Sequence, residues 1–319
     1  MERLTRDPVS ETKNFIAFII AAAGLAAFFS TSYFPGTVGG AFISSPLNFP
    51  EASDKKVMSP KFAAGAAPLA LTARAALARD RGSGAVLFEK NPSAVLPIAS
   101  LTKLMTAIVV FKNAAPDEIV VIETADTKVP LYRADLVPGE KITVRGLLEA
   151  MLISSANDAA MALVRHGGAG AAQFVQKMNA EASRLGMDST SFANPVGFDD
   201  PAHYSTAEDL SRLVNEFLLY PQLVEIVSTK EAVISSADGK YIHHAVTTNK
   251  LLTEYREVRG LKTGYTSEAR GNLIVLADAD SPDGSGAQYY SIILGSDQRE
   301  EEMLKLMNWI KENYRWNLQ

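Results

Sequence analysis

The order in which helical and strand-like segments follow one another restricts the fold of this chain more than any other feature of its sequence. After a short strand-like run at 84–88, four segments have the length and apolar spacing of helices: 100–112, 143–164, 171–185 and 206–219. Strand-like runs then occupy 231–235, 241–247, 257–264, 271–278 and 288–295, and an amphipathic helix is expected at 299–315. This order predicts an α/β (α+β) domain, in which an antiparallel sheet is flanked by helices and carries a helical insertion.

Three local expectations add detail. The Ala-rich stretch 63–79 is expected to open the folded domain as a first helix. The runs 271–278 and 288–295 are separated by the turn-rich segment SPDGSGAQ, so they are expected to form a hairpin. Residues 100–112 are apolar on all sides, which is typical of a helix buried at the centre of a domain.

The N-terminal segment 14–34 is uncharged and mostly apolar, and about 20 apolar residues can cross a bilayer as a helix. Arg3, Arg6 and Lys13 precede it and no Lys or Arg follows until Lys55, which predicts a cytoplasmic N-terminus and an exported remainder. A cleaved signal peptide is the alternative, although no clear A-x-A-like site directly follows the apolar core. The expected organisation is a cytoplasmic N-terminus (1–13), a transmembrane anchor or signal peptide (14–34), a linker (35–69) and an exported domain (70–319).

Composition excludes several classes of function. The net charge is -5 and no basic stripe stands out, so a nucleic-acid partner is not expected. The chain has no cysteine, which removes thiol catalysis, disulfides and cysteine-ligated zinc. The four histidines form no H-E-x-x-H pattern, so a zinc protease is poorly supported. We therefore expect no metal and no cofactor.

The first segment that carries chemistry is Ser100-Leu101-Thr102-Lys103. Positions i and i+3 share one face of a helix, so a hydroxyl lies beside an amine. Burial lowers the pKa of a lysine, and a neutral lysine can take the proton of Ser100 without a histidine. Taken alone, S-x-x-K also occurs by chance with a solvated lysine.

The second segment, Ser155-Ala156-Asn157, interrupts the helical region 143–164. A serine and an asparagine two residues apart converge on one site only from a loop or a helix junction. There Ser155 could relay a proton to a leaving amine and Asn157 could bond a substrate amide. The alternative is a helix N-cap, for which both residue types are favoured.

The third segment, Lys262-Thr263-Gly264, ends the strand-like run 257–264. A lysine and a hydroxyl on a strand edge suit a substrate carboxylate, and Gly264 would let substrate backbone approach closely. A basic residue followed by a turn is the alternative.

S-x-x-K, S-x-N and K-T-G occur in this order, which is a signature of penicillin-binding proteins and β-lactamases. The chain resembles the low-molecular-mass penicillin-binding proteins, the serine D-Ala-D-Ala carboxypeptidases, over residues 70–319. The stretches that carry the resemblance are LPIASLTKLMTA (96–107), LISSANDAA (152–160), FANPVGF (192–198), HYSTAEDL (203–210) and GLKTGYTSEA (260–269). It implies a β-lactamase/transpeptidase-like fold, with a five-stranded antiparallel sheet, helices on both faces and a helical subdomain beside the active-site cleft.

The resemblance also implies a role for each site residue. Ser100 would form the acyl-enzyme with Lys103 as its base, while Ser155 and Asn157 would assist proton transfer and bind substrate. The terminal carboxylate would be contacted by Lys262 and Thr263. The backbone N–H groups of Ser100 and Tyr265 would form the oxyanion hole. Arg299, which opens a stretch resembling one in the family, would be a further candidate for binding the carboxylate, with a surface salt bridge as its alternative. A structural hydrogen bond is expected for His203.

The implied activity is trimming of peptidoglycan stem pentapeptides by a D-Ala-D-Ala carboxypeptidase, with β-lactams as covalent inhibitors. The alternatives are an endopeptidase of the same family that cuts cross-links and a non-catalytic penicillin-binding wall protein. A β-lactamase is disfavoured because no E-x-x-L-N segment is evident. Arg270 departs from the Ala-Gly pair that many relatives carry, which affects the expected shape of the cleft. Because the chain ends at Gln319, soon after its last helix, membrane attachment is expected through the N-terminal helix.

Overall fold

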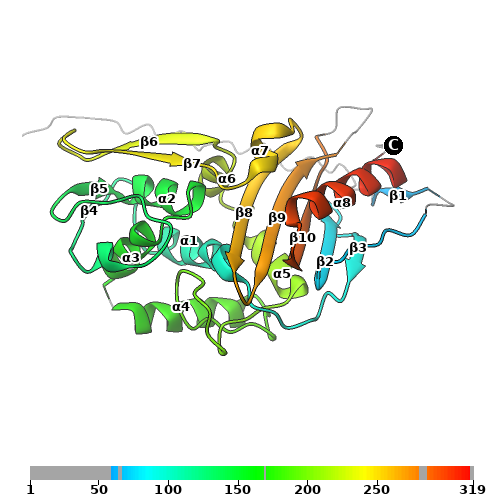
Figure 1. Ribbon diagram of the computed structural model, residues 1–319, viewed down its shortest axis with the longest axis horizontal. Coiled ribbons are helices and arrows are strands. Elements are labelled where there is room, and N and C mark those ends of the chain that lie inside the picture. Colours follow the sequence, from blue (N-terminus) through cyan, green and yellow to red (C-terminus); the bar gives the residue numbers. More distant parts are fainter. Residues whose placement is uncertain (1–58, 64–66, 169, 280–285, 317–319) are drawn as a thin grey trace, which may run out of the picture. The chain divides into compact units, whose positions relative to one another are not determined.

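Five antiparallel strands form the frame on which the site is built (Figure 1), in the order β3–β2–β10–β9–β8. They are β2 (Ala75–Asp80), β3 (Val86–Lys90), β8 (Val258–Thr266), β9 (Arg270–Asp278) and β10 (Gln288–Ser296). The computed structural model describes residues 59–63, 67–168, 170–279 and 286–316. The expected membrane segment 14–34 lies outside these residues, and within them no helix is both long and apolar enough to cross a membrane.

The inner strands β2, β10 and β9 are buried on both faces, and alternate residues of each strand point to opposite faces. In β9, Ile274 and Leu276 belong to the core shared with the helical part, whereas Leu273 and Val275 belong to a second core. The helix α8 (Arg299–Asn313) covers that second face, as Figure 1 shows. It contributes Met303, Leu306, Met307 and Ile310 to the second core. The expected hairpin is confirmed, because β9 and β10 pair along their length.

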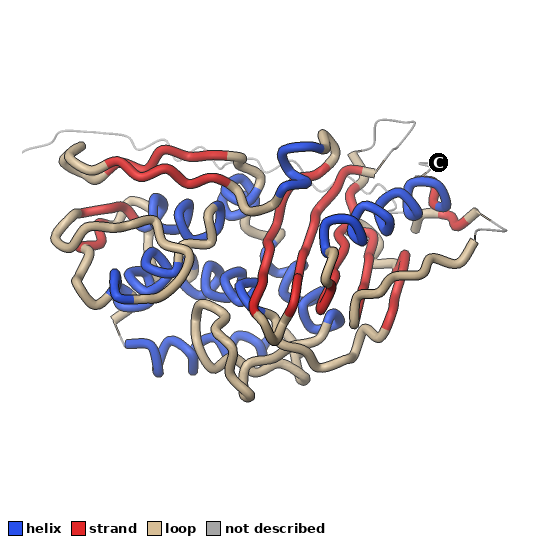
Figure 2. Tube along the Cα trace, in the orientation of Figure 1, coloured by secondary structure: helices blue, strands red, loops and turns tan. Residues whose placement is uncertain are grey.

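The helical part lies against the other face of the sheet (Figure 2). Its helices are α1 (Lys103–Phe111), α2 (Val144–Ile153), α3 (Asn157–His166), α4 (Gly170–Arg184), α5 (Ala207–Phe217) and α6 (Pro221–Val227). Eight of the nine residues of α1, from Lys103 to Val110, are buried, and α1 contacts α2, α3, α4 and α5. The expectation of a central buried helix is therefore confirmed.

The expected first helix at 63–79 is wrong. Residues 75–80 form β2, which is paired on both sides by β3 and β10. Ala75, Ala76 and Ala78 are fully buried, and their small side chains let neighbouring layers pack closely against this strand. Pairing with β3 and β10 therefore overrides the helix propensity of alanine. Lys61–Phe62, expected within the linker, form β1 and pair with β11 (Tyr314–Arg315).

Several short elements were not expected from the sequence. They are the helices α6 and α7 (Lys250–Glu254), the 3-10 turn η2 (Asp126–Lys128), and β4 (Ile119–Val121) with its partner β5 (Lys141–Thr143). The expected strands β6 (Glu231–Ser235) and β7 (Ile242–Val246) pair with each other outside the main sheet. They form a hairpin whose inner face packs on α2.

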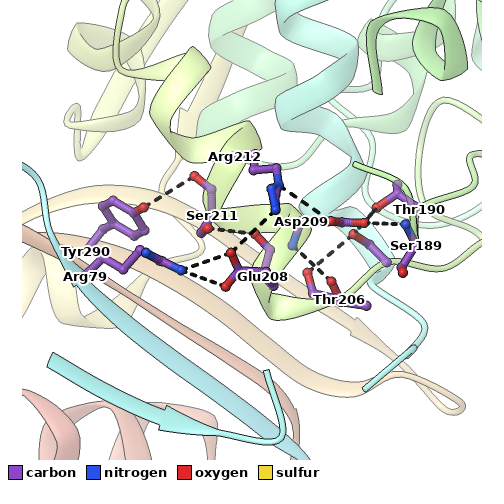
Figure 3. A network of polar contacts seen from close by, with 10 residues as sticks. Arg79, Ser189, Thr190, Thr206, Glu208, Asp209, Ser211, Arg212 and Tyr290 are labelled. Atoms are coloured by element: carbon purple, nitrogen blue, oxygen red, sulfur yellow. Dashed lines mark hydrogen bonds and ion pairs between the residues drawn. The ribbon is translucent and has the colours of Figure 1, made fainter. Parts of the chain in front are cut away.

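The N-terminus of α5 is fixed to both the sheet and a neighbouring loop (Figure 3). Arg79 of β2 forms an ion pair with Glu208 at 2.8 Å. Asp209 accepts hydrogen bonds from Ser189 N–H and from the hydroxyl of Thr190, each at 2.8 Å, while its own N–H donates to the capping Thr206 hydroxyl. This network holds the segment 189–206, which packs against the turn 99–102. We call this turn the nucleophile turn, because Ser100 is the expected nucleophile.

Candidate active site

Ser100 and Lys103 lie together at the start of the central helix. Ser100 belongs to the 3-10 turn η1 (Ala99–Thr102), and Lys103 is the first residue of α1. Lys103 Nζ is 3.0 Å from Ser100 Oγ and donates to the carbonyl of Val196 at 2.8 Å. The structure thus brings together the hydroxyl and the amine that the i, i+3 spacing pairs.

Two buried lysines and an arginine give the site its electrostatics. Lys103 is 0% exposed, and this burial, reinforced by the charge of Lys262, holds its pKa well below the ordinary lysine value. Burial, together with the charge of Arg299, lowers the pKa of Lys262 to about 7. A lysine with a depressed pKa is more often neutral at neutral pH, so Lys103 is suited to accept a proton.

Ser155 and Asn157 lie at the junction of α2 and α3. Ser155 has a φ of +63° and is buried. Ala156 is the N-cap of α3 and no side chain caps the helix, so the capping alternative is wrong. Asn157 Nδ2 instead donates to the carbonyls of Pro130 and Leu131, each at 3.0 Å. Its buried Oδ1 has no hydrogen-bond partner among the described residues.

The segment Lys262–Tyr265 runs along β8, which is an edge strand of the main sheet among the residues that the structure describes. The hydroxyl of Thr263 is 2.6 Å from that of Thr248. A Cβ on Gly264 would lie 3.1 Å from the Ser100 nitrogen and 3.0 Å from the Ile98 carbonyl oxygen. Gly264 therefore lets β8 approach the nucleophile turn closely, in addition to any role toward substrate.

Arg299, the first residue of α8, reaches the same strand. Its Nη1 donates to the Gly264 carbonyl at 2.8 Å, and its Nε donates to Glu300 at 2.8 Å. A Cβ on Gly271 would lie 3.0 Å from Arg299 Cδ, so this glycine leaves room for the arginine. The surface salt bridge is present, but the side chain is also bound to the strand that carries the K-T-G segment.

The loop 192–198 supports the nucleophile turn from behind. Thr106 donates to the Pro195 carbonyl at 2.6 Å, and the Asn194 side chain accepts from Gly197 N–H at 2.8 Å. His203 Nδ1 accepts from Ala193 N–H at 3.0 Å and its Nε2 lies 2.7 Å from the Thr102 hydroxyl. His203 thus makes structural hydrogen bonds, and burial lowers its pKa to about 4.

A small cavity opens above Ser100. Its lining residues come from every part of the site: Ser100, Tyr132, Ser155, Thr248, Thr263, Gly264, Tyr265 and Arg299. Lys103, Asn157 and Lys262 are buried and do not line this cavity. Sequence reasoning missed Tyr132 and Thr248, because both lie in irregular segments outside the recognised motifs.

Arg270 lies at the turn between β8 and β9, with a φ of +58°. Its guanidinium pairs with Asp297 at 2.7 Å, and both side chains are largely exposed. It is not among the residues that line the cavity. Among the residues that the structure describes, no three His, Asp or Glu side chains gather in a way that could hold a metal ion.

Comparison with known proteins shows what this chain is similar to. The family model described as D-alanyl-D-alanine carboxypeptidase, peptidase S11, matches residues 61–286. D-alanyl-D-alanine carboxypeptidase DacF of Bacillus subtilis is 35% identical over 208 residues, which are 63% of this chain and 53% of that protein. A D-alanyl-D-alanine endopeptidase of Pseudomonas aeruginosa is 36% identical over 211 residues, or 65% of this chain and 67% of the relative. The match thus spans about half the length of DacF.

Solved structures show the same fold. The DD-transpeptidase of Streptomyces K15 superposes with a TM-score of 0.71 at 30% identity, covering 76% of this chain and 98% of that one. A D-alanyl-D-alanine carboxypeptidase from Mycobacterium tuberculosis superposes with a TM-score of 0.70 at 30% identity, covering 79% and 95%. The expected arrangement of a five-stranded antiparallel sheet with helices on both faces is therefore confirmed.

Proposed function

Because the chain belongs to the peptidase S11 family of D-alanyl-D-alanine carboxypeptidases, we propose that it removes the terminal D-Ala from peptidoglycan stem pentapeptides. The observation that carries the proposal is the 3.0 Å approach of Lys103 Nζ to Ser100 Oγ. Burial lowers the pKa of this lysine, so that it can act as a base without histidine. A non-catalytic wall protein would have no need of such a pair.

In the proposed reaction, Ser100 Oγ attacks the carbonyl of the penultimate D-Ala while Lys103 takes the hydroxyl proton. The C–N bond then breaks as a proton reaches the leaving amine through Ser155, and D-Ala departs. Water attacks the resulting ester, returns a proton and frees Ser100. Backbone N–H groups of Ser100 and Tyr265 would stabilise the oxyanion, an interaction that is typically worth about 3–4 kcal/mol.

The free carboxylate of the substrate would bind at the end of the cavity where Thr263, Thr248 and Arg299 meet. The Lys262 ammonium lies beneath them and adds positive charge when protonated. Asn157, with an unpartnered buried Oδ1, could accept a hydrogen bond from the substrate amide or from Lys103. A β-lactam, which also presents a carboxylate and a reactive carbonyl, would acylate Ser100 and act as a covalent inhibitor.

An endopeptidase is the second candidate, because relatives that bear this name match the chain as well as those called carboxypeptidases do. Such an enzyme would cut the cross-link between two stems, so that its leaving group is part of a second stem. The two candidates share the chemistry of Ser100 and differ in the size of the leaving group.

We also propose that the catalytic domain is extracytoplasmic and that segment 14–34 holds it at the membrane. The apolar character of this segment and the positive charges before it support the proposal. Sequencing the N-terminus of the mature protein from a membrane fraction tests it. Loss of residues 1–30 would identify a signal peptide instead of an anchor.

The activity is tested by incubating the protein with a stem pentapeptide and, separately, with a cross-linked stem dimer. We expect release of D-Ala from the pentapeptide, and no release from either substrate by the Ser100→Ala variant. Monomer release without D-Ala release would establish the endopeptidase. Labelling by a fluorescent penicillin without turnover of either peptide would contradict both peptidase activities and favour a non-catalytic penicillin-binding protein.

A further inference from the structure

A strained loop forms one wall of the cavity. Leu131, Tyr132 and Asp135 have φ values of +58°, +37° and +56°. A non-glycine residue in this region costs on the order of 1–3 kcal/mol and persists only where its surroundings enforce it. Such strain is often found where a side chain must be held in a functional position.

Buried side chains of α3 enforce the conformation of this loop. Asn157 holds the carbonyls of Pro130 and Leu131, and its backbone N–H donates to the Tyr132 carbonyl at 2.6 Å. The Asp158 carboxylate, fully buried, accepts from Ala134 N–H at 2.9 Å. The backbone on either side of Tyr132 is therefore fixed.

His243 of β7 restrains the same loop from the opposite side. Its Nδ1 is 3.0 Å from the Ala134 carbonyl, and its Nε2 is 2.9 Å from the Glu140 carboxylate. The loop is thus clamped between α3 and the β6–β7 hairpin. An exposed tyrosine in a loop is usually an unconstrained surface side chain, but Tyr132 is carried on a backbone with little freedom.

Tyr132 faces the part of the cavity where the residue after the scissile bond would lie. The proposed carboxylate site is at Thr248, Thr263 and Arg299, and the attacked carbonyl must lie at Ser100. The terminal residue bridges these two points, so its side chain must lie against the remaining lining, which consists of Tyr132, Ser155, Gly264 and Tyr265. The cavity is small and partly open, so a side chain larger than a methyl group would lie against the ring of Tyr132.

We propose that Tyr132 is a specificity-determining residue that limits the leaving group to a small D-amino acid with a free carboxylate. The inference rests on the proposed carboxypeptidase function and favours it over cross-link cutting. A steric wall of this kind discriminates by size, and a difference of one methylene group is worth about 10–200-fold in kcat/KM. The ring of Tyr132 matters in this role, whereas its hydroxyl does not.

The test compares acyl-D-Ala-D-X peptides in which X is D-Ala, D-Leu or D-Lys, and measures kcat/KM for wild type and Tyr132→Gly. Glycine suits a positive φ, so this variant is expected to fold at least as stably as wild type. We expect the ratio of kcat/KM for D-Leu to that for D-Ala to rise at least tenfold. Tyr132→Phe should keep the wild-type ratio, as should Leu131→Ala, which changes a neighbouring exposed side chain outside the cavity lining.

The inference would be overturned if the D-Leu to D-Ala ratio of kcat/KM in Tyr132→Gly stayed within twofold of wild type. It would also be overturned if Leu131→Ala raised this ratio as much as Tyr132→Gly does. Failure of the proposed function has a different signature. In that case the wild-type protein would release no residue from any of the three peptides, although a fluorescent penicillin still labels Ser100.

Discussion

Lys103 Nζ lies 3.0 Å from Ser100 Oγ, and its second hydrogen bond goes to the Val196 carbonyl at 2.8 Å. A neutral amine can satisfy both partners, because it donates to the carbonyl and accepts the serine proton. Lys103 is buried, so its pKa is depressed and the neutral form is accessible. These contacts support the proposal that Lys103 activates Ser100.

The first prediction concerns this base. Lys103→Met, which keeps the side chain as far as Cε but lacks the amine, should slow acylation by a fluorescent penicillin about 10²–10⁴-fold, the usual contribution of a general base. Ser100→Ala should abolish labelling. Lys112→Met is the matched control, because Lys112 follows the same helix but pairs with Glu181 and Glu216 at the surface. Normal acylation in Lys103→Met would assign the base role to another residue.

The second prediction concerns pH. Burial and the charge of Arg299 lower the pKa of Lys262 to about 7, so this lysine is charged below that pH and neutral above it. If the charge helps to bind the substrate carboxylate, kcat/KM should fall as the pH rises through about 7. Arginine stays charged at every accessible pH. In Lys262→Arg the decline should therefore disappear, whatever the remaining rate, and a decline that persists unchanged would contradict the assignment.

The parts of the site that local spacing determines could be predicted from the sequence. Ser100 and Lys103 are one helical turn apart, so their contact follows from helix geometry. Lys262, Thr263 and Gly264 follow one another on a strand, so their placement on β8 follows from the strand prediction. The break between α2 and α3 at Ser155 was also expected.

The parts that depend on long-range packing could not be predicted. Tyr132 reaches the cavity only because Asn157, which follows it by 25 positions, binds its loop. Thr248 reaches Thr263 from an irregular segment after β7. The alanine run of β2 has a helical composition, and only its pairing with β3 and β10 makes it a strand.

The third prediction concerns acid stability. His203 Nδ1 accepts from Ala193 N–H, so the neutral ring carries its proton on Nε2 and donates to the Thr102 hydroxyl. Burial lowers the folded-state pKa to about 4, against about 6.5 in an unfolded chain. Between these values the unfolded state binds more protons, so the free energy of unfolding should fall as the pH drops from 6.5 to 4, by on the order of 3 kcal/mol.

Urea unfolding at pH 7.5 and pH 4.5 measures this effect. His203→Gln should be less stable than wild type at the higher pH but should lose less stability on acidification. His244→Gln is the control, since His244 lies on the exposed face of β7. Equal acid sensitivity in wild type and His203→Gln would show that other groups dominate.

The last prediction separates backbone strain from close packing at the nucleophile turn. Gly197 has a φ of +92°, and a Cβ there would lie 2.0 Å from the Ala99 carbonyl oxygen and 2.8 Å from the Ser100 nitrogen. Gly84 has a φ of +72° but nothing within 4 Å of its Cβ position. Gly84→Ala should therefore cost only the left-handed conformation, about 1–2 kcal/mol of unfolding free energy, and leave acylation unchanged.

Gly197→Ala should cost about 1–3 kcal/mol more than Gly84→Ala, because the turn must move to relieve the overlap. The displacement of Ala99 and Ser100 should also slow acylation by a fluorescent penicillin, up to about 10²-fold if the hydroxyl moves by 1 Å relative to Lys103. Urea unfolding and the acylation rate, measured on both variants, give the two quantities separately. Equal losses of stability together with equal acylation rates would mean that the loop 192–198 is not what positions Ser100.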